Sequence, residues 1–174
     1  MIIQSQNVMD LLQKLLRPVS IDCVSFQSKP LQSAALLSKL NGSVLSFSTS
    51  APTTEIHSIN NLKMMSLLIR DKWAEDELVK QEQVDTTNGH ATWPPSNIKN
   101  CYQYETPSTE GGEPLTTNIY TYEIEELHAC VCQLPRSDLL LLFIAEASFP
   151  FGLLALKMQK AVTPFQGLHG YQLG

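Results

Sequence analysis

The sequence predicts one α/β domain of the α+β type, in which a five-stranded antiparallel sheet carries helices on both faces. Asn41-Gly42 lies between two apolar segments and predicts a two-residue hairpin turn, because both positions tolerate a positive φ. The run from Leu139 to Ala145 is apolar throughout, which is typical of a central strand covered on both sides. A helical segment from Ile59 to about Asp76 has apolar residues on two opposite sides.

The length and charge of the chain exclude several classes of protein. Its 174 residues give room for one compact domain, so residues 1–174 are assigned to a single domain. Twelve basic residues stand against 17 acidic ones, for a formal net charge of −5. This balance excludes the clustered positive charge of a nucleic-acid-binding protein. It also argues against direct docking on anionic lipid.

The first third of the chain predicts a helix followed by strands. Residues 6–17 place five apolar side chains at helical spacing, and Pro18 ends the pattern. A short strand is expected at 23–27. Longer strands at 34–40 and 44–49 flank the Asn41-Gly42 turn.

The second helix, which Ser58 is expected to cap, has more apolar surface than one sheet contact requires. One side carries a first apolar set, made of Ile59, Leu62, Met65, Ile69 and Trp73. The other side carries a second set, made of Met64, Leu67 and Leu68. The second set has two explanations. Either the helix is sunk in the middle of the core, or this side is a subunit interface.

Residues 77–118 interrupt the pattern and predict a mostly disordered acidic insertion. The stretch is rich in proline, glycine and acidic residues and is too long for an ordinary connection. Trp93, Tyr102 and Tyr104 lie inside it and are candidates for a short anchor on a partner, although aromatic residues in a loop commonly have no such role.

The last third predicts three consecutive strands and a helix. The strands are expected at 119–125, 127–134 and 139–145, with a turn at 135–138. A helix then begins after Pro150 and ends near Pro164. The predicted order is helix, two strands, helix, insertion, three strands, helix.

Catalytic patterns are not found in the sequence. There is no glycine-rich phosphate loop, and the four histidines have no metal-ligand spacing. Cys130 and Cys132 fall on one face of a strand and are interpreted as small core residues. A nucleophile pair of His128 and Cys130 would lie inside a core hairpin without a cleft. We therefore predict no catalytic residue, no metal site and no cofactor.

Two surface features suggest recognition instead. No lysine or arginine occurs between Lys99 and Arg136, and Glu123, Glu125 and Glu126 make this region acidic, which favours a basic partner face. Arg136 falls in the predicted turn at 135–138. An exposed arginine there is a candidate arginine finger for a GTPase, a role that requires a preorganised loop.

Targeting signals are also not found. The N-terminal residues have no basic region of a secretory signal, and the longest apolar run is too short to span a bilayer. No myristoylation or prenylation motif is present. The expectation is a protein with reduced thiols that reaches any membrane through a partner.

Three segments carry a resemblance to a known family. The hairpin NGSVLSFS, the helix INNLKMMSLLIRDKW and the C-terminal DLLLLFIAEASFPFGLLALKM resemble the roadblock family of small dimeric adaptors, which is related to the longin fold. The blocks INNLKMMSLLIRDKWAEDE and IYTYEIEELHACVCQLPRSDLLLLFIAEASFPFGLLALKM, with the ending HGYQLG, are similar to roadblock subunits of the fungal EGO complex, the counterpart of Ragulator. The resemblance omits residues 77–118.

The resemblance implies a scaffold that pairs through its second helix and third long strand, so that two sheets join. The partner is a second roadblock-type subunit, in a homodimer or a heterodimer. The strand is expected at the sheet edge, where unpaired backbone groups invite pairing. The interface residues implied are Met64, Leu67, Leu68, Asp71, Ile119, Tyr120, Thr121, Tyr122, Glu123 and Ile124.

The resemblance also implies the cellular role. A lipidated subunit would wrap the roadblock pair on the cytoplasmic face of the vacuolar membrane. The pair would hold Rag-type GTPases and support amino-acid signalling to target of rapamycin complex 1. The alternatives are another roadblock or longin adaptor, such as a motor light chain or a vesicle-trafficking protein, and a GTPase regulator that uses Arg136.

Overall fold

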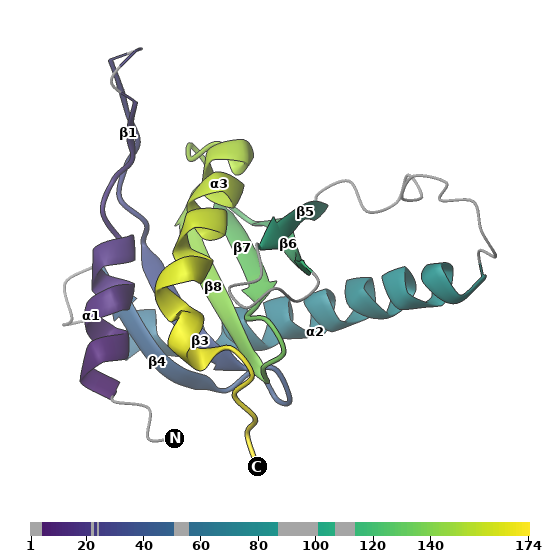
Figure 1. The fold of residues 1–174 in the computed structure, drawn as a ribbon. Coiled ribbons are helices and arrows are strands. Elements are labelled where there is room, and N and C mark those ends of the chain that lie inside the picture. The colour runs from purple at the N-terminus through teal and green to yellow at the C-terminus, as the bar shows by residue number, and fades with distance from the viewer. Residues whose placement is uncertain (1–4, 22, 24, 51–55, 87–100, 107–113) are drawn as a thin grey trace.

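The computed structural model describes residues 5–21, 23, 25–50, 56–86, 101–106 and 114–174 (Figure 1). Its helices and strands are α1 (Ser5–Leu15), β1 (Ser20–Ile21), β2 (Phe26–Gln27), β3 (Ser33–Ser38), β4 (Val44–Thr49), α2 (Ile56–Thr86), β5 (Cys101–Thr106), β6 (Leu115–Ile124), β7 (Leu127–Gln133), β8 (Leu139–Glu146), α3 (Phe151–Val162) and the 3₁₀ helix η1 (Thr163–Leu168). In this part of the chain, no helix has the length and apolar character needed to cross a membrane.

The main sheet has six strands in the order β4-β3-β8-β7-β6-β5, and every neighbouring pair is antiparallel. β8 lies between β3 and β7, and its residues from Leu139 to Ala145 are all buried. The prediction of a central strand covered on both faces is confirmed. Its continuous apolar run is what such a position requires, because both sets of alternating side chains face a core.

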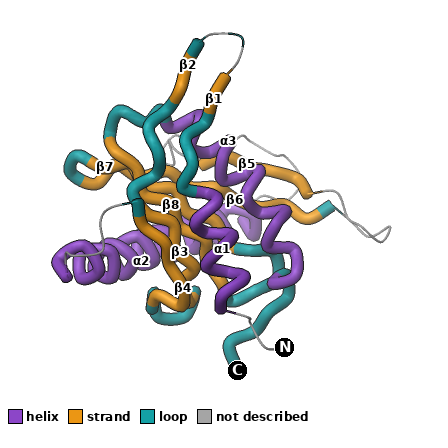
Figure 2. The backbone as a smooth tube through the Cα atoms, turned by 90° about the vertical axis from the view of Figure 1, so that its left-hand side faces the viewer, coloured by secondary structure: helices purple, strands orange, loops and turns teal. Residues whose placement is uncertain are grey.

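Helices cover both faces of this sheet, which confirms the predicted fold class. α1 and α3 lie on one face and α2 lies on the other (Figures 1 and 2). The alternating side chains of β8 divide between the two layers. Leu139, Leu141 and Phe143 pack in the cluster with α1 and α3, whereas Leu140, Leu142 and Ile144 pack in the cluster with α2.

The N-terminal elements largely follow the sequence pattern. α1 ends at Leu15, before Pro18. The prediction of a two-residue turn at Asn41-Gly42 is wrong, because β3 ends at Ser38 and the Ser38 N–H donates to the Ser43 carbonyl at 2.9 Å, which leaves a loop of residues 39–42. Gly42 takes the positive φ, 71°, in this loop, and Asn41 does not. The short strand expected at 23–27 is β2, and it pairs with β1, which the sequence did not predict. Figure 2 shows β1 and β2 projecting from the body as an arm.

The second helix is longer than predicted. It begins at Ile56, so Ser58 lies within the helix and does not cap it, and it continues to Thr86. The prediction of a disordered insertion over 77–118 is therefore wrong for residues 77–86, 101–106 and 115–118, which are helix or strand. Residues 87–100, with Trp93, and 107–113 lie outside the described residues.

The sheet has one strand more than predicted. β5 pairs along β6 from Cys101 opposite Tyr120 to Thr106 opposite Leu115. β6 is consequently not at the sheet edge over residues 115–120, and the prediction that the strand from Ile119 to Ile124 is an edge strand is wrong for Ile119 and Tyr120. β5 has a strand-like alternation in CYQYET, but it lies among polar and proline-rich residues that resemble a loop.

The C-terminal residues stabilise the turn between β7 and β8 through hydrogen bonds. α3 continues directly into η1, which has Pro164 in its first turn. After η1, the Gly170 N–H donates to the Pro135 carbonyl at 2.9 Å. The Leu173 N–H donates to the Asp138 carboxylate at 3.2 Å. These contacts hold the turn from two sides.

Arg70 on α2 holds the β3–β4 turn against the helix. Its Nε donates to the Lys39 carbonyl at 2.8 Å, and its Nη2 donates to the Leu40 carbonyl at 2.6 Å. We expect Arg70→Ala to lower the free energy of unfolding by about 1–2 kcal/mol, because two carbonyls lose a charged donor. Arg70→Lys should recover only part of this, since an ammonium lacks the planar fork. Urea denaturation of both variants measures the effect, and an unchanged midpoint for Arg70→Ala would contradict it.

Candidate interaction surface

The side of α2 that faces away from the sheet carries an exposed apolar stripe. Met64, Leu67 and Leu68 are 63%, 48% and 59% exposed, and Leu78 and Val79 are also exposed. These five residues, which we call the outer α2 stripe, share one side of the helix at 100° per residue. The opposite side is buried. This arrangement excludes a helix sunk in the core, and the role of this side as a subunit interface stays a prediction.

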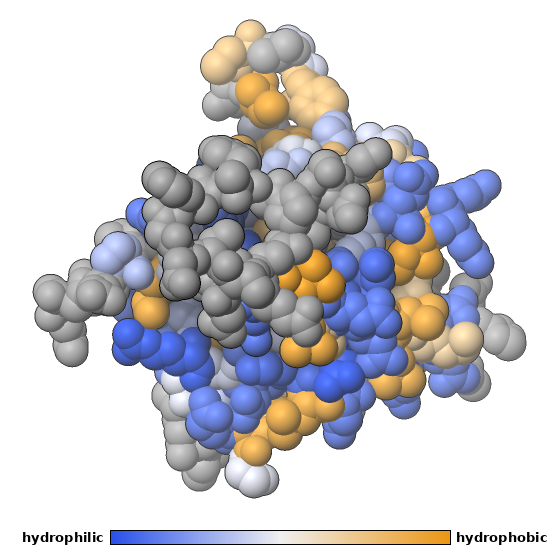
Figure 3. All heavy atoms as spheres, turned by 90° about the vertical axis from the view of Figure 1, so that its right-hand side faces the viewer, coloured by the Kyte–Doolittle hydropathy of each residue, from blue (hydrophilic) through white to orange (hydrophobic). Residues whose placement is uncertain are grey.

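Carboxylates lie along the outer α2 stripe. Asp71 and Glu75 are exposed between its two apolar groups. Asp71 forms an ion pair with Arg70 at 2.9 Å, and Glu75 lies 4.0 Å from Lys72. Exposed pairs of this kind contribute little to stability, so the carboxylates can turn towards a partner at small cost. Figure 3, drawn from the right-hand side of Figure 1, shows hydrophobic and hydrophilic patches side by side on the surface.

The β3–β4 turn extends the apolar surface beside α2. A Cβ atom added to Gly42 would lie 3.3 Å from Leu67 Cδ2, so the turn lies against the helix at this point. The neighbouring Leu40 is exposed. The surface therefore combines a helix face with a tightly held turn.

The predicted interface residues on β6 are not all at the surface. Ile119, Tyr120 and Thr121 are buried, with Ile119 in the α1–α3 cluster and Tyr120 in the α2 cluster. The β5 pairing ends at Tyr120. Of the later residues, Glu123 is exposed and its two neighbours are half-buried. The structure thus brings only the end of β6 to the open part of the sheet edge, and the interface role of these residues stays a prediction.

A half-buried polar network joins the C-terminal half of α2 to β6. The Tyr120 hydroxyl and the Asn118 amide both donate to Glu77 Oε1, at 2.8 and 3.0 Å. Lys80 Nζ donates to Asn118 Oδ1 at 2.6 Å. These bonds explain why α2 continues past the predicted end, because its polar residues here are paired with the sheet. In the sequence, these residues are an acidic pair on the helix and a tyrosine on the strand. They are more than 40 residues apart, so no helical or strand periodicity predicts that they interact.

Tyr122 makes a parallel contact, in which its hydroxyl donates to Asp76 Oδ2 at 2.8 Å. Its ring stacks with that of Tyr120, with centroids 6.3 Å apart. Burial raises the pKa of both hydroxyls well above 10, and the neighbouring carboxylates raise the pKa further. The neutral hydroxyl is favoured because it donates to a carboxylate.

These raised pKa values predict loss of stability at alkaline pH. An unfolded tyrosine titrates near 10, so above about pH 10 the unfolded state loses protons that the native state keeps. Stability contributed by Tyr120 and Tyr122 is therefore present below pH 10 and is lost as the pH rises above it. We expect the urea midpoint of the native chain to fall more steeply between pH 9 and 11 than that of the Tyr120→Phe/Tyr122→Phe variant. Equal slopes would contradict this.

The candidate nucleophiles are held as core residues. Cys130 and Cys132 are fully buried in β7, and burial raises the pKa of both thiols, that of Cys132 to about 12. His128 Nδ1 lies 2.7 Å from the Phe149 carbonyl oxygen, and its ring stacks on Phe151 with centroids 3.7 Å apart. Among the described residues, no group of three potential ligands is placed to hold a metal.

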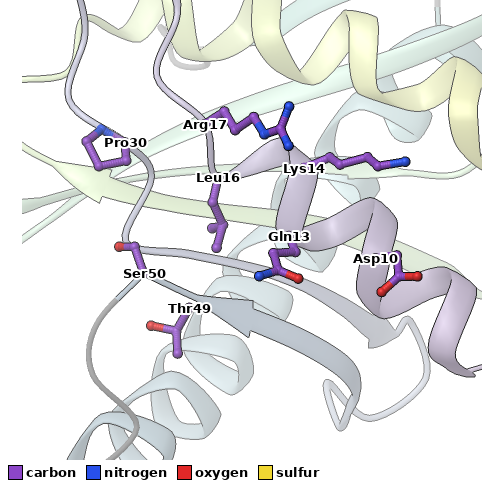
Figure 4. Close-up of a pocket in the computed structure, with 8 residues that line it drawn as sticks. All are labelled: Asp10, Gln13, Lys14, Leu16, Arg17, Pro30, Thr49 and Ser50. Carbon is purple, nitrogen blue, oxygen red and sulfur yellow. The ribbon is translucent and has the colours of Figure 1, made fainter.

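One surface pocket lies between the end of α1 and the end of β4. It has a volume of about 570 Å³ (Figure 4). It is lined by Asp10, Gln13, Lys14, Leu16, Arg17, Pro30, Thr49 and Ser50. The lining has both charge signs and no histidine or cysteine, so it offers no nucleophile with a base beside it.

Arg136 is exposed on a preorganised turn. The residue has a φ of 56°, and its carbonyl accepts a hydrogen bond from Gln172 Nε2 at 2.8 Å. Ser137 Oγ donates to the Leu134 carbonyl at 2.8 Å. At the opposite end of β7, at the turn between β6 and β7, Glu125 and Glu126 are exposed, as is Glu123 beside them.

Comparisons with known proteins agree with this architecture. The family model described as Protein SLM4 matches residues 2–173. Protein SLM4 of Saccharomyces cerevisiae is 44% identical over 178 residues, which cover 99% of this chain and 98% of that protein. The crystal structure of a Roadblock/LC7 domain from Streptomyces avermitilis matches with a TM-score of 0.51 and 15% identity, covering 91% of this chain and 94% of that one. Myxococcus xanthus MglB has a TM-score of 0.44 and 10% identity, covering 97% and 91%. The chain has a roadblock/LC7 fold and belongs to the Protein SLM4 family.

Proposed function

We propose that this protein is a non-enzymatic scaffold that pairs with a second roadblock-type subunit through the outer α2 stripe. The observation that carries the proposal is an apolar helix face that the described chain leaves uncovered. Exposed apolar patches of this kind, with polar residues around them, mark protein interaction sites. The roadblock/LC7 fold supports the choice of a similar domain as the partner.

The geometry of the stripe fits helix packing. Met64 and Val79 are separated by about 22 Å along a regular helix, which is four turns. A partner helix along this face would cover five apolar side chains and pass over Asp71 and Glu75, which lie between the two apolar groups, so it would place polar or basic residues opposite them. The β5 pairing ends at Tyr120, so the end of β6 beyond it has backbone groups that a partner strand could pair with. In this proposal the helix face and the end of β6 are the two parts of the interface, and the strand part is shorter than predicted.

The proposed cellular role is to anchor Rag-type GTPases on the cytoplasmic face of the vacuolar membrane and to support amino-acid signalling to target of rapamycin complex 1. In this proposal a lipidated subunit holds the roadblock pair on the membrane. The full-length identity of 44% to Protein SLM4, and the resemblance of two long sequence blocks to EGO roadblock subunits, support it.

Purification from the native cell tests this role. The tagged protein is isolated under mild conditions, and stoichiometric partners are identified by mass spectrometry. We expect a second roadblock chain, a small acylated protein and a GTPase pair. Dynein chains or vesicle-trafficking factors in their place would support another roadblock or longin adaptor. Recovery of the chain alone would contradict the proposal.

Arg136 supports a second candidate, a regulator that contributes an arginine finger to a GTPase. The observation in its favour is that Arg136 is exposed on a turn whose backbone is held by a hydrogen bond from Gln172. The two candidates differ in the hydrolysis of GTP by the copurified GTPases. For a scaffold, Arg136→Ala leaves the hydrolysis rate unchanged. For a regulator, Arg136→Ala and Arg136→Lys both slow hydrolysis by about 1,000-fold or more, because an ammonium does not replace the guanidinium fork.

A further inference from the structure

Met64 is the most exposed large apolar side chain in the part of the chain that the structure describes. It lies on the outer α2 stripe, one turn before Leu67 and Leu68, which follow it at the i+3 and i+4 positions and are also exposed. Among the five side chains of this stripe, the thioether of Met64 is the group that a mild oxidant converts, because methionine forms a sulfoxide and leucine and valine do not react. The stripe therefore contains a residue that can be modified.

The other described methionines differ from Met64 in their surroundings. Met9 is exposed on α1, Met65 is half-buried against the α2 cluster, and Met158 is fully buried in the α1–α3 cluster. Because oxidation follows the exposure of the sulfur, we expect Met64 to react first and Met9 second. Pairing through α2 would cover Met64 and leave Met9 free. Oxidation of Met64 would therefore take place on the unpaired chain.

The unpaired chain can accommodate a sulfoxide at this position. Side chains of a helix lean towards its N-terminus, so Met64 lies over the turn that contains Asn60 and Asn61, both of which are exposed. Water and these side-chain amides are hydrogen-bond donors for a sulfoxide oxygen. Met64 belongs to neither hydrophobic cluster of the fold. Oxidation of this residue should therefore leave the fold of the chain intact.

The paired chain would be much less tolerant of the same change. A partner helix on the outer α2 stripe packs apolar side chains against Met64, Leu67 and Leu68. Oxidation turns a flexible apolar side chain into a polar one. Burying the new oxygen without a donor costs as much as a lost hydrogen bond, which corresponds to about a tenfold or larger loss of affinity. Met64 thus favours pairing when reduced and opposes it when oxidised.

We propose that Met64 is a redox-sensitive modification site, at which oxidation to the sulfoxide by a peroxide prevents pairing through the outer α2 stripe. In this step a lone pair of the sulfur attacks one oxygen of hydrogen peroxide, so that an S–O bond forms and the O–O bond breaks. The departing hydroxyl takes the proton of the transferred oxygen and leaves as water. The sulfur loses two electrons, and the peroxide gains them. The inference rests on the proposed function, because it requires the stripe to be the pairing surface.

Pairing of an oxidised chain tests the proposal. The unpaired chain is treated briefly with hydrogen peroxide, freed from it and mixed with the pairing subunit. Mass spectrometry of the tryptic peptide 64–70, MMSLLIR, locates the sulfoxide, since fragments that begin at Met65 distinguish the two adjacent methionines. Sedimentation measures the pairing, for a second copy of the chain as well as for a different subunit. We expect at least tenfold weaker pairing with an unchanged circular dichroism spectrum. Native-like pairing of the chain oxidised at Met64 would overturn the proposal.

Two leucine variants are the matched controls. Met64→Leu keeps an apolar side chain of similar volume, so it should pair normally and continue to pair after peroxide treatment. Met9→Leu removes the other exposed sulfur, and this variant should lose pairing after treatment as the native chain does. If peroxide also prevents pairing of Met64→Leu, another residue is responsible and the proposal is wrong.

Enzymatic reduction separates the sulfoxide from irreversible damage. Methionine sulfoxide reductases A and B, which act on the two epimers of the sulfoxide, should restore both Met64 and the pairing. Pairing that stays weak after Met64 has been reduced would contradict the proposal.

Leu68→Asp distinguishes failure of this inference from failure of the proposed function. If Leu68→Asp does not pair but the chain oxidised at Met64 does, the stripe remains the pairing surface and the inference about Met64 is wrong. If Leu68→Asp pairs at the level of the native chain, the stripe is not the pairing surface, and both proposals are overturned.

Discussion

Leu68→Asp is expected to abolish pairing through α2 while leaving a folded chain. In the single chain the side chain is 59% exposed, so the carboxylate stays in water and costs little stability. In the pair it would be buried without a partner charge, and the apolar contact of leucine would be lost. These two effects together weaken binding by about 100-fold or more. Copurification of the pairing subunit and circular dichroism of the variant measure the two parts of the prediction.

The matched control for this variant is Leu156→Asp on α3. It makes the same chemical change at a similarly exposed leucine on the opposite layer. We expect it to retain the pairing subunit at the level of the native chain. If Leu68→Asp pairs as well as Leu156→Asp, the outer α2 stripe is not the pairing surface.

Trp73→Ala is expected to produce the largest loss of stability, about 3–5 kcal/mol, because it empties a large site in the α2 cluster. Trp73 is 4% exposed and packs between α2 and the sheet. Removing it should lower the denaturation midpoint and weaken pairing in parallel, since the outer stripe depends on the position of the helix. Thermal and urea denaturation report the first effect, and copurification reports the second.

Trp73→Phe is the control for the loss of packing. The indole Nε1 has no hydrogen-bond partner among the described residues, so a phenyl ring removes no such bond. We expect this variant to keep most of the stability and all of the pairing. An unfolding free energy for Trp73→Ala within about 1 kcal/mol of that of the native chain would contradict the packing described for α2.

The parts of the fold that the sequence predicted are those with a local apolar pattern. β8 is apolar from Leu139 to Ala145 because it is central. The sequence also located the connection between β3 and β4, where Gly42 takes a positive φ, although the loop spans residues 39–42 and is longer than predicted. β5 and the C-terminal half of α2 were missed. They are stabilised by contacts between residues far apart in the chain, such as Glu77 with Tyr120, and local patterns do not show such contacts.

The residues of the candidate surface were likewise predicted only where the sequence has a local apolar pattern. Met64, Leu67 and Leu68 were predicted from helical spacing, and the structure exposes all three. Leu78 and Val79 were missed because they fell in the segment interpreted as an insertion. The assignment of β6 to the sheet edge failed at Tyr120 and before it, since β5 covers the strand there.

Methionine oxidation tests the central claim most directly, because the chain carries its own reporters. Met64 is 63% exposed on the outer α2 stripe, Met9 is 45% exposed on α1, and Met158 is fully buried. The single chain and the purified two-chain pair are exposed briefly to peroxide, and sulfoxide at each methionine is measured by mass spectrometry. We predict at least tenfold protection of Met64 in the pair, with Met9 oxidised equally in both and Met158 unreactive. Equal oxidation of Met64 in the single chain and in the pair would contradict pairing through α2.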